Sequence, residues 1–516
     1  MKRIFVRLLF AAASGLLVAG AFPPVDWGFL GWVGLVPLLC LLRRCSWRVG
    51  VGYGLVTGFV FFLCFLYYIN QFGVVPWIAL ALFQAAYFAV AAGVIAALRR
   101  CAPGLLWPLA AAAVWTAMTY VRGHVGALSL PFGELGHTQH AALGMAQAAS
   151  VVGGLGLTFL LVLVNAVIAE LITTAASVPG AARAAVRACV FVGAALLILM
   201  LAGHVKFQVA RRQLEAASDR ALRAVAVQAD IYAGREPDVG IGYDAARAYV
   251  ELSTSPEAAG ADLLVWPETA LVVDPDREPR FGALVNETTA RTGAHLLFGH
   301  LRIDEDGSIH NAASLQAPDG RRLGEYHKVH LVLFGEYVPY RKRFPWLERF
   351  PVRSYDIDPG EGWTTLNADG FRLGPLICFE SLFPSMSREV VRQGADILVI
   401  ITSDAWAGRT AELWQHGYVS VFRAIEQGRY LIRAGTSGLT CIISPYGEML
   451  AQVEPFTQGV AAADVLPLEK RTVYSRLGDW PLLCACALII ALALAAARRC
   501  PPVMAEEGRE TRCGES

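Results

Sequence analysis

Residues 186–230 read VRACVFVGAALLILMLAGHVKFQVARRQLEAASDRALRAVAVQAD. This stretch passes from an apolar run at 186–204, long enough to cross about 30 Å of hydrocarbon, to a charged connection and a Val-rich strand candidate at 221–228. Upstream of residue 205 the only acidic side chains are Asp26, Glu134 and Glu170, and the chain has 43 Asp and Glu in total. The chain therefore divides here into a lipid-soluble part and a water-soluble part.

Composition supports this division. Of the 516 residues 55% are hydrophobic and 17% charged, where soluble domains carry about 25% charged residues, so a purely soluble protein is disfavoured. The net charge of +1 argues against a nucleic-acid binder, which must neutralise many phosphates. At about 150 residues per domain, the length allows two to four domains.

Eight apolar segments have the length needed to cross a bilayer. They are 4–21, 27–42, 51–70, 75–97, 104–120, 156–174, 186–204 and 481–497. The second is short and interrupted by glycine, and Gly153, Gly154 and Gly156 indicate a bend where the sixth begins. We predict a membrane domain of eight transmembrane helices, seven within 1–205 and the eighth at 481–498.

Basic residues predict the orientation, because Lys and Arg in short loops stay on the cytoplasmic side. They fill every second connection, Arg122 excepted: Lys2 and Arg3; Arg43, Arg44 and Arg48; Arg99 and Arg100; Arg183 and Arg187. Both termini are therefore expected inside, with 215–470 on the outer face and 499–516 as a cytoplasmic tail. The first segment also imitates a cleavable secretory signal, an alternative that leaves this topology unchanged.

The outer region alternates short strand candidates with helical patterns, which favours an α/β layered domain with its ligands at the carboxyl ends of strands. Strands are expected at 221–228, 262–266, 295–299, 312–316, 371–378, 395–402, 435–444 and 449–453, and helices at 242–251, 280–292, 384–393 and 412–427. Helical spacing continues in the arginines from Arg423 to Arg433, where internal ion pairs are expected.

Three chemically complementary residues follow strand candidates: Glu268, Lys328 and Cys378. Each is weak evidence alone, because a single Glu or Lys is usually a solvated surface group. Together they supply a base, a cation for an oxyanion and a thiol nucleophile. Of the 11 cysteines only Cys378 and Cys441 belong to the outer region, so a disulfide between them, or two buried thiols, is the alternative.

Motifs around these residues resemble a known superfamily. WPE at 266–268, YHK at 326–328 with FGEYVP at 334–339, and ICFE at 377–380 are similar to the three catalytic motifs of the nitrilase, or carbon-nitrogen hydrolase, superfamily. FPP at 22–24, the segment 157–165 and the membrane spans resemble its membrane-embedded branch, the apolipoprotein N-acyltransferase family. His327, Leu333, Phe379, Asp230 and Ser403 depart from the usual pattern, and none of them removes a catalytic group.

The resemblance implies an αββα sandwich in the outer domain and a ping-pong acyl transfer, with Cys378 as nucleophile, Glu268 as base and Lys328 as oxyanion partner. Lys328 is also expected to lower the Cys378 pKa. Supporting positions are Glu336, Glu380 and Phe379. For Glu336 we favour an orienting role toward Lys328 over direct catalysis, and the role of Glu380 stays open.

The resemblance also implies the partners. The donor would be a phospholipid and the acceptor a diacylated apolipoprotein, in a monomer of the bacterial inner membrane with its catalytic domain in the periplasm, without a metal or cofactor. Phe334 and the basic, aromatic loop 337–355, with Trp346 and Phe350, are candidates for lipid access. A packed surface loop is an equal alternative.

Two rival functions remain from the sequence. A membrane-anchored amidase would use the same Glu, Lys and Cys but release acyl groups to water. A transporter would need charged groups inside the spans, for which Arg7 and Glu170 offer thin support.

Overall fold

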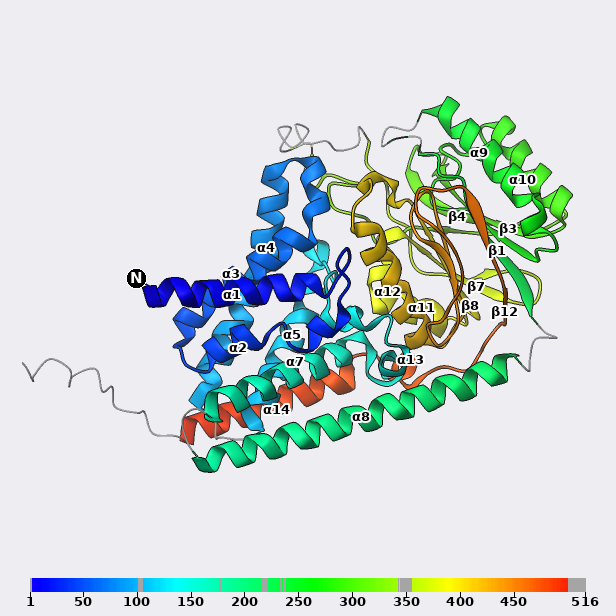
Figure 1. Cartoon of the computed structure of the whole chain (residues 1–516). Helices are drawn as coiled ribbons and strands as arrows, with labels where there is room; N and C mark the ends of the chain where they lie inside the picture. Colours follow the sequence, from blue (N-terminus) through cyan, green and yellow to red (C-terminus); the bar gives the residue numbers. More distant parts are fainter. Residues whose placement is uncertain are drawn as a thin grey trace, which may run out of the picture.

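The computed structural model describes residues 2–100, 105–175, 179–215, 221–232, 234, 238–341, 343 and 355–499. Helices occupy the front part of the chain, and two β-sheets flanked by helices form the back part (Figure 1). The long helix α8 (Pro179–Glu215) runs beneath both and leads from one to the other (Figure 1).

The front part is almost entirely helical. Besides α8 it comprises α1 (Lys2–Gly20), α2 (Val36–Leu42), α3 (Trp47–Phe65), α4 (Val74–Ala97), α5 (Leu106–Arg122), α6 (Leu143–Ala146) and α7 (Ala149–Ala175), with 3-10 turns including η1 (Gly28–Trp32) and η2 (Tyr67–Phe72); α14 (Trp480–Arg499) returns to it from the C-terminal side. In the described part of the chain, six helices are long and apolar enough to cross a membrane, namely α1, α3, α4, α7, α8 and α14.

Two of the eight predicted spans are shorter in the structure. The second consists of η1 and the seven-residue α2, which begins at a proline-containing turn, and the fifth is the 17-residue α5. Six of the eight predicted segments therefore match helices long enough to cross a membrane, and the total of eight transmembrane helices stays a prediction. The predicted bend is confirmed at Gly153, whose φ of 69° interrupts α7.

Glu170 and Arg43 form an ion pair inside the helical part. The Arg43 Nε atom lies 2.7 Å from a carboxylate oxygen of Glu170, whose side chain is only 4% exposed. This pair ties the end of α2 to α7. Because it satisfies the charge on Glu170, this residue is explained by packing and does not support a transporter.

Two six-stranded sheets form the back part. One has the order β12-β1-β2-β3-β4-β5 and the other β11-β10-β9-β8-β7-β6. The strands are β1 (Leu222–Gln228), β2 (Leu263–Val265), β3 (His295–Ile303), β4 (Ile309–Gln316), β5 (Arg322–His327), β6 (Leu366–Asn367), β7 (Arg372–Ile377), β8 (Ile397–Thr402), β9 (Leu431–Gly435), β10 (Thr440–Ile443), β11 (Met449–Val453) and β12 (Gly459–Val465). In each sheet three central strands run parallel, β1 to β3 and β7 to β9.

Four helices cover the outer faces of the sheets, so the layer order is helix, sheet, sheet, helix. They are α9 (Val239–Ser253), α10 (Pro279–Thr292), α11 (Pro384–Arg392) and α12 (Glu412–Gln427), and each overlaps a helix predicted from the sequence. Buried Val265 and Ala313 from one sheet meet Val399 and Ile432 from the other in the core between the sheets. This arrangement agrees with the predicted α/β layered domain.

The strand prediction was wrong in one place and incomplete in others. The expected strand 435–444 is confirmed only at β10 (Thr440–Ile443), because residues 436–439 form the turn between β9 and β10, which pair antiparallel. The helical spacing expected across 429–433 is also wrong, because Gly428 ends α12 with φ +63° and these residues enter β9. Short β6 and the Ala-rich β12 were not predicted, and of the polar strand β5 only the end at 324–327, before Lys328, was recognised.

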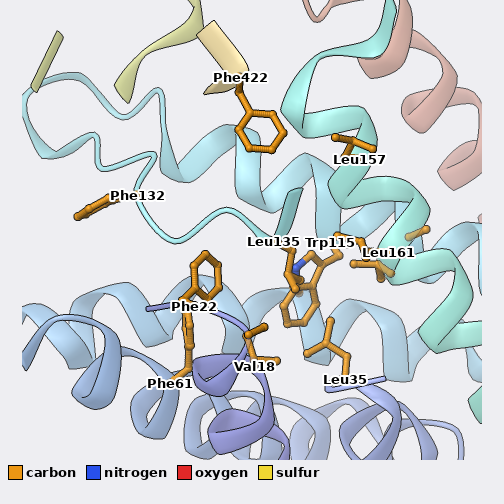
Figure 2. Close-up of a cluster of buried hydrophobic side chains, with 14 of the residues drawn as sticks. Val18, Phe22, Leu35, Phe61, Trp115, Phe132, Leu135, Leu157, Leu161 and Phe422 are labelled. Carbon is orange, nitrogen blue, oxygen red and sulfur yellow. The ribbon is translucent and has the colours of Figure 1, made fainter. Parts of the chain in front are cut away.

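The α11 and α12 layer packs directly on the membrane helices. A single cluster of buried hydrophobic side chains includes Leu376 of β7, Val390 of α11, Phe422 of α12 and Leu157 of α7. Figure 2 shows Phe422 facing the helical part, near Leu157. At this junction lies the predicted internal ion pair, since Arg423 Nη2 and Glu426 Oε2 are 2.8 Å apart and both side chains are fully buried. The two parts therefore share one core.

Candidate active site

The three predicted catalytic side chains meet at one edge of the sandwich. Glu268 lies shortly after β2, while Lys328 and Cys378 directly follow β5 and β7. All three line one cavity of about 150 Å³. The carboxyl ends of strands from both sheets converge here, which is where an α/β layered fold is expected to hold its chemistry.

Lys328 is almost completely buried, with 1% of its surface exposed. Its Nζ atom donates to Glu336 Oε1 at 2.9 Å and to Glu268 Oε1 at 3.4 Å. Burial alone would lower the pKa of Lys328, but the charges of Glu336 and Glu268 outweigh it and raise the pKa above its ordinary value. Lys328 is therefore a fixed cation in the lining of the cavity.

Cys378 begins the 3-10 turn η9 (Cys378–Leu382) with a left-handed φ of +55°. Such a conformation costs a non-glycine residue about 1–3 kcal/mol and persists only where its surroundings impose it. Burial raises the Cys378 pKa well above its ordinary value, Glu268 raises it further, and Lys328 lowers it. The expected pKa-lowering effect of Lys328 is present but outweighed, so the resting thiol is protonated and needs a base.

Glu268 is positioned as a hydrogen-bond acceptor by two groups besides Lys328. Its Oε1 accepts from Asn311 Nδ2 at 2.6 Å, and its Oε2 accepts from the backbone N–H of Ser403 at 2.8 Å. Sequence reasoning missed Asn311, because β4 also contains the polar residues His310, Ser314 and Gln316, and nothing in the sequence distinguishes Asn311 from them. The contact with Ser403 could not be predicted from the sequence, because any residue except proline supplies a backbone N–H.

Glu336 holds Lys328 from the other side. Its Oε1 accepts from Lys328 and, at 3.1 Å, from Asn311 Nδ2, while its Oε2 accepts from the backbone N–H of Val332 at 2.8 Å. Burial would raise the pKa of Glu336, but Lys328 reverses the effect and lowers it. This geometry fits an orienting role.

Glu380 is fully buried and every hydrogen bond it makes is structural. Its Oε1 accepts from the Tyr326 hydroxyl at 2.8 Å and from the backbone N–H groups of Val329 and His330 at 2.9 and 3.0 Å. Its Oε2 accepts from the Ile377 N–H at 2.8 Å. Glu380 thus joins the segments that carry Lys328 and Cys378, and it does not line the cavity.

Aromatic side chains also line the cavity. Phe334, 42% exposed and with φ +61°, lines it together with Phe379. Sequence reasoning missed Trp406 and Phe72, whose rings lie 5.8 Å apart. Phe72 belongs to η2 in the helical part, so the cavity borders both halves of the molecule. The predicted lipid-access residues Trp346 and Phe350 lie outside the described residues.

Cys378 and Cys441 do not form the disulfide considered from the sequence. Both are free and buried, and Cys441 lies on β10 within the second sheet. Cys441 does not line the cavity.

Comparison with known proteins matches both halves of the chain. The family model described as the apolipoprotein N-acyltransferase N-terminal domain matches residues 14–167, and the carbon-nitrogen hydrolase model matches 213–470. An apolipoprotein N-acyltransferase of Geobacter metallireducens is 32% identical over 502 residues, which cover 94% of this chain and 95% of that protein. The chain belongs to the apolipoprotein N-acyltransferase family.

A second relative agrees with this assignment, and the chain is also similar to a solved structure. The Gloeobacter violaceus apolipoprotein N-acyltransferase is 30% identical and covers 95% of this chain and 94% of its own length. A crystal structure of an amidase from Nesterenkonia sp. is 21% identical with a TM-score of 0.37, over 51% of this chain and 94% of that one. The two sheets of this family member form its nitrilase-like α/β domain. Its six long apolar helices indicate a membrane protein.

Proposed function

We propose that this chain transfers an acyl group from a phospholipid to the N-terminal amine of the diacylglyceryl-cysteine of apolipoproteins and so completes lipoprotein maturation. Its relatives carry the name apolipoprotein N-acyltransferase. The observation that carries the proposal is the cavity in which Cys378, Glu268 and Lys328 meet beside Phe72 of the helical part. A reactive thiol at the junction with membrane helices is suited to a lipid donor.

In the first half-reaction Glu268 takes the thiol proton of Cys378 as the sulfur attacks the ester carbonyl carbon of the phospholipid. The negative charge that develops on the carbonyl oxygen is stabilised by the buried ammonium of Lys328. The carbon–oxygen bond then breaks, and Glu268 returns the proton to the leaving lysophospholipid oxygen. The acyl group remains as a thioester on Cys378.

In the second half-reaction the lipoprotein amine attacks the thioester carbonyl. Glu268 accepts a proton from the attacking nitrogen, the carbon–sulfur bond breaks, and the proton goes to the departing sulfur. Donor and acceptor use one site in turn, which gives ping-pong kinetics. Glu336 keeps the Lys328 ammonium in place through both halves, and Glu380 keeps the two loops together.

We place the chain in the bacterial inner membrane. Residues 1–205 would form the transmembrane domain, 215–470 the periplasmic catalytic domain, 481–498 the last transmembrane helix and 499–516 a cytoplasmic tail, in a monomer with both termini inside. Accessibility of single cysteines introduced at exposed Glu305 and near the N-terminus to a membrane-impermeant maleimide tests this topology. Labelling of the first from the cytoplasmic side alone would refute it.

A membrane-anchored amidase is the second candidate, because the same three groups also hydrolyse acyl compounds. The cavity of about 150 Å³ that Cys378 lines has room for the water molecule that hydrolysis needs. The test is incubation of the protein with phospholipid and a diacylated lipopeptide, followed by mass analysis. Transfer predicts a lipopeptide heavier by one acyl group, whereas release of free fatty acid with an unchanged lipopeptide would establish hydrolysis.

A further inference from the structure

A second group of polar side chains lies behind Cys378, outside the cavity. Asp404 of the 3-10 turn η10 (Asp404–Ala407), His416 of α12 and Ser381 of η9 are fully buried, and none of them lines the cavity. The mechanism proposed above uses none of the three. Burial of so many polar groups is costly unless they are bonded to one another.

The contacts form a continuous chain that ends on the nucleophile. Asp404 Oδ1 lies 2.9 Å from His416 Nδ1, and His416 Nε2 lies 2.9 Å from Ser381 Oγ. The Ser381 hydroxyl donates to the carbonyl oxygen of Cys378 at 2.7 Å. Each hydrogen bond in this series therefore fixes the next side chain. The last one, from Ser381, holds the backbone carbonyl of Cys378, whose φ is left-handed.

Asp404 is itself held from two sides. Thr402 Oγ1 donates to its Oδ1 at 2.7 Å, and Arg433 Nη2 donates to its Oδ2 at 2.7 Å. Asp404 is therefore fixed by Thr402 at the end of β8 and by Arg433 of β9. This explains why the buried carboxylate, imidazole and guanidinium are clustered at this one turn.

The same cluster has donor atoms of the kind that bind metals. Atoms of Asp404, Glu412 and His416 lie within 4.8 Å of one another. However, the Arg433 guanidinium bonds to Asp404 and approaches His416 Nδ1 to 3.2 Å. A protein cation therefore already contacts two of these three side chains, and we interpret the cluster as a hydrogen-bonded support.

We propose that Asp404, His416 and Ser381 are positioning residues that hold Cys378 in its strained conformation, with its sulfur facing Glu268 and Lys328. The proposal rests on the function of Cys378 proposed above and adds the device that keeps this thiol in place. Ser381 is the direct link, because its hydroxyl donates to the Cys378 carbonyl while the same oxygen contacts His416 Nε2. Without the Ser381 hydroxyl, the carbonyl oxygen of Cys378 loses the side-chain hydrogen bond that supports the left-handed conformation.

Ser381→Ala is the cleanest test, because it removes one hydroxyl and little volume. Ser387→Ala is the matched control, since Ser387 is equally buried and donates in the same way to the carbonyl of Pro384, three residues before it, at 3.0 Å. The readout is the burst of p-nitrophenolate from p-nitrophenyl butyrate, with the acyl group located on Cys378 by mass. This ester reports the nucleophile whatever the natural donor and acceptor are.

Ser381→Ala should lower the acylation rate constant about tenfold, the effect of one lost hydrogen bond, with KM unchanged, while Ser387→Ala keeps the parent rate. His416→Gln should show a similar loss, and the double variant should lose little more than either single variant, because both act through one path. Equal rates for Ser381→Ala and Ser387→Ala, or additive losses, would overturn the proposal. Absence of an acyl group on Cys378 in the parent protein would instead refute the proposed function.

Discussion

Replacing Glu336 and Glu268 by glutamine should affect the reaction to very different extents. Glu336 accepts from three donors: Lys328, Asn311 and the Val332 N–H. A glutamine has one acceptor oxygen, so at least one donor loses its partner, at about 1–3 kcal/mol. Because Glu268 still faces Lys328 at 3.4 Å, the ammonium stays charged, and we expect activity to fall about tenfold to hundredfold.

Glu268→Gln removes the proton acceptor for a thiol whose pKa is raised. Loss of a general base costs about 100- to 10,000-fold, and we expect the upper part of this range. The assay is acyl transfer from phospholipid to a diacylated lipopeptide, followed by mass spectrometry, with thermal unfolding to verify folding. Asp274→Asn is the control, since Asp274 is a buried carboxylate outside the cavity. A larger loss with Glu336→Gln than with Glu268→Gln would refute the assigned roles.

Three further predictions concern the thiol, lipid access and the shared core. Because the Cys378 pKa is raised and only the thiolate reacts, iodoacetamide labelling of Cys378 should keep rising above pH 9, and a plateau below pH 8 would contradict this. Replacing Trp346 and Phe350 by Ser should raise the KM for phospholipid, and unchanged lipid turnover would count against a role in lipid access. Arg423→Met, which removes the cation partner of fully buried Glu426, should lower stability in detergent by about 3–5 kcal/mol. Arg291→Met, at an exposed pair, should leave the melting temperature unchanged.

Sequence alone predicted the parts of the structure that depend on local pattern. Apolar length identified the helices α1, α3, α4, α7, α8 and α14, and strand ends identified the positions of Glu268, Lys328 and Cys378. These succeed because a membrane span needs a long apolar run, and because catalytic groups follow strands at the carboxyl edge.

Features that depend on contacts between distant segments were missed. Trp406 meets Phe72 across the junction of the two halves, and no local pattern connects residues so far apart. Arg433 follows helical spacing from Arg429 but lies on β9. A buried strand tolerates the charge of Arg433 because Asp404, a partner distant in the sequence, forms an ion pair with it. The lowering effect of Lys328 on the Cys378 pKa was predicted, but the larger raising effect of burial was not, because burial is a property of the fold.

The central claim is that Cys378 carries the acyl group during transfer. Purified protein incubated with phospholipid alone, then digested and weighed, should yield the Cys378 peptide heavier by one acyl chain, and addition of diacylated lipopeptide should remove that mass. The same acyl mass on the corresponding peptide of Cys378→Ala, or transfer to lipopeptide by that variant at the parent rate, would contradict the account.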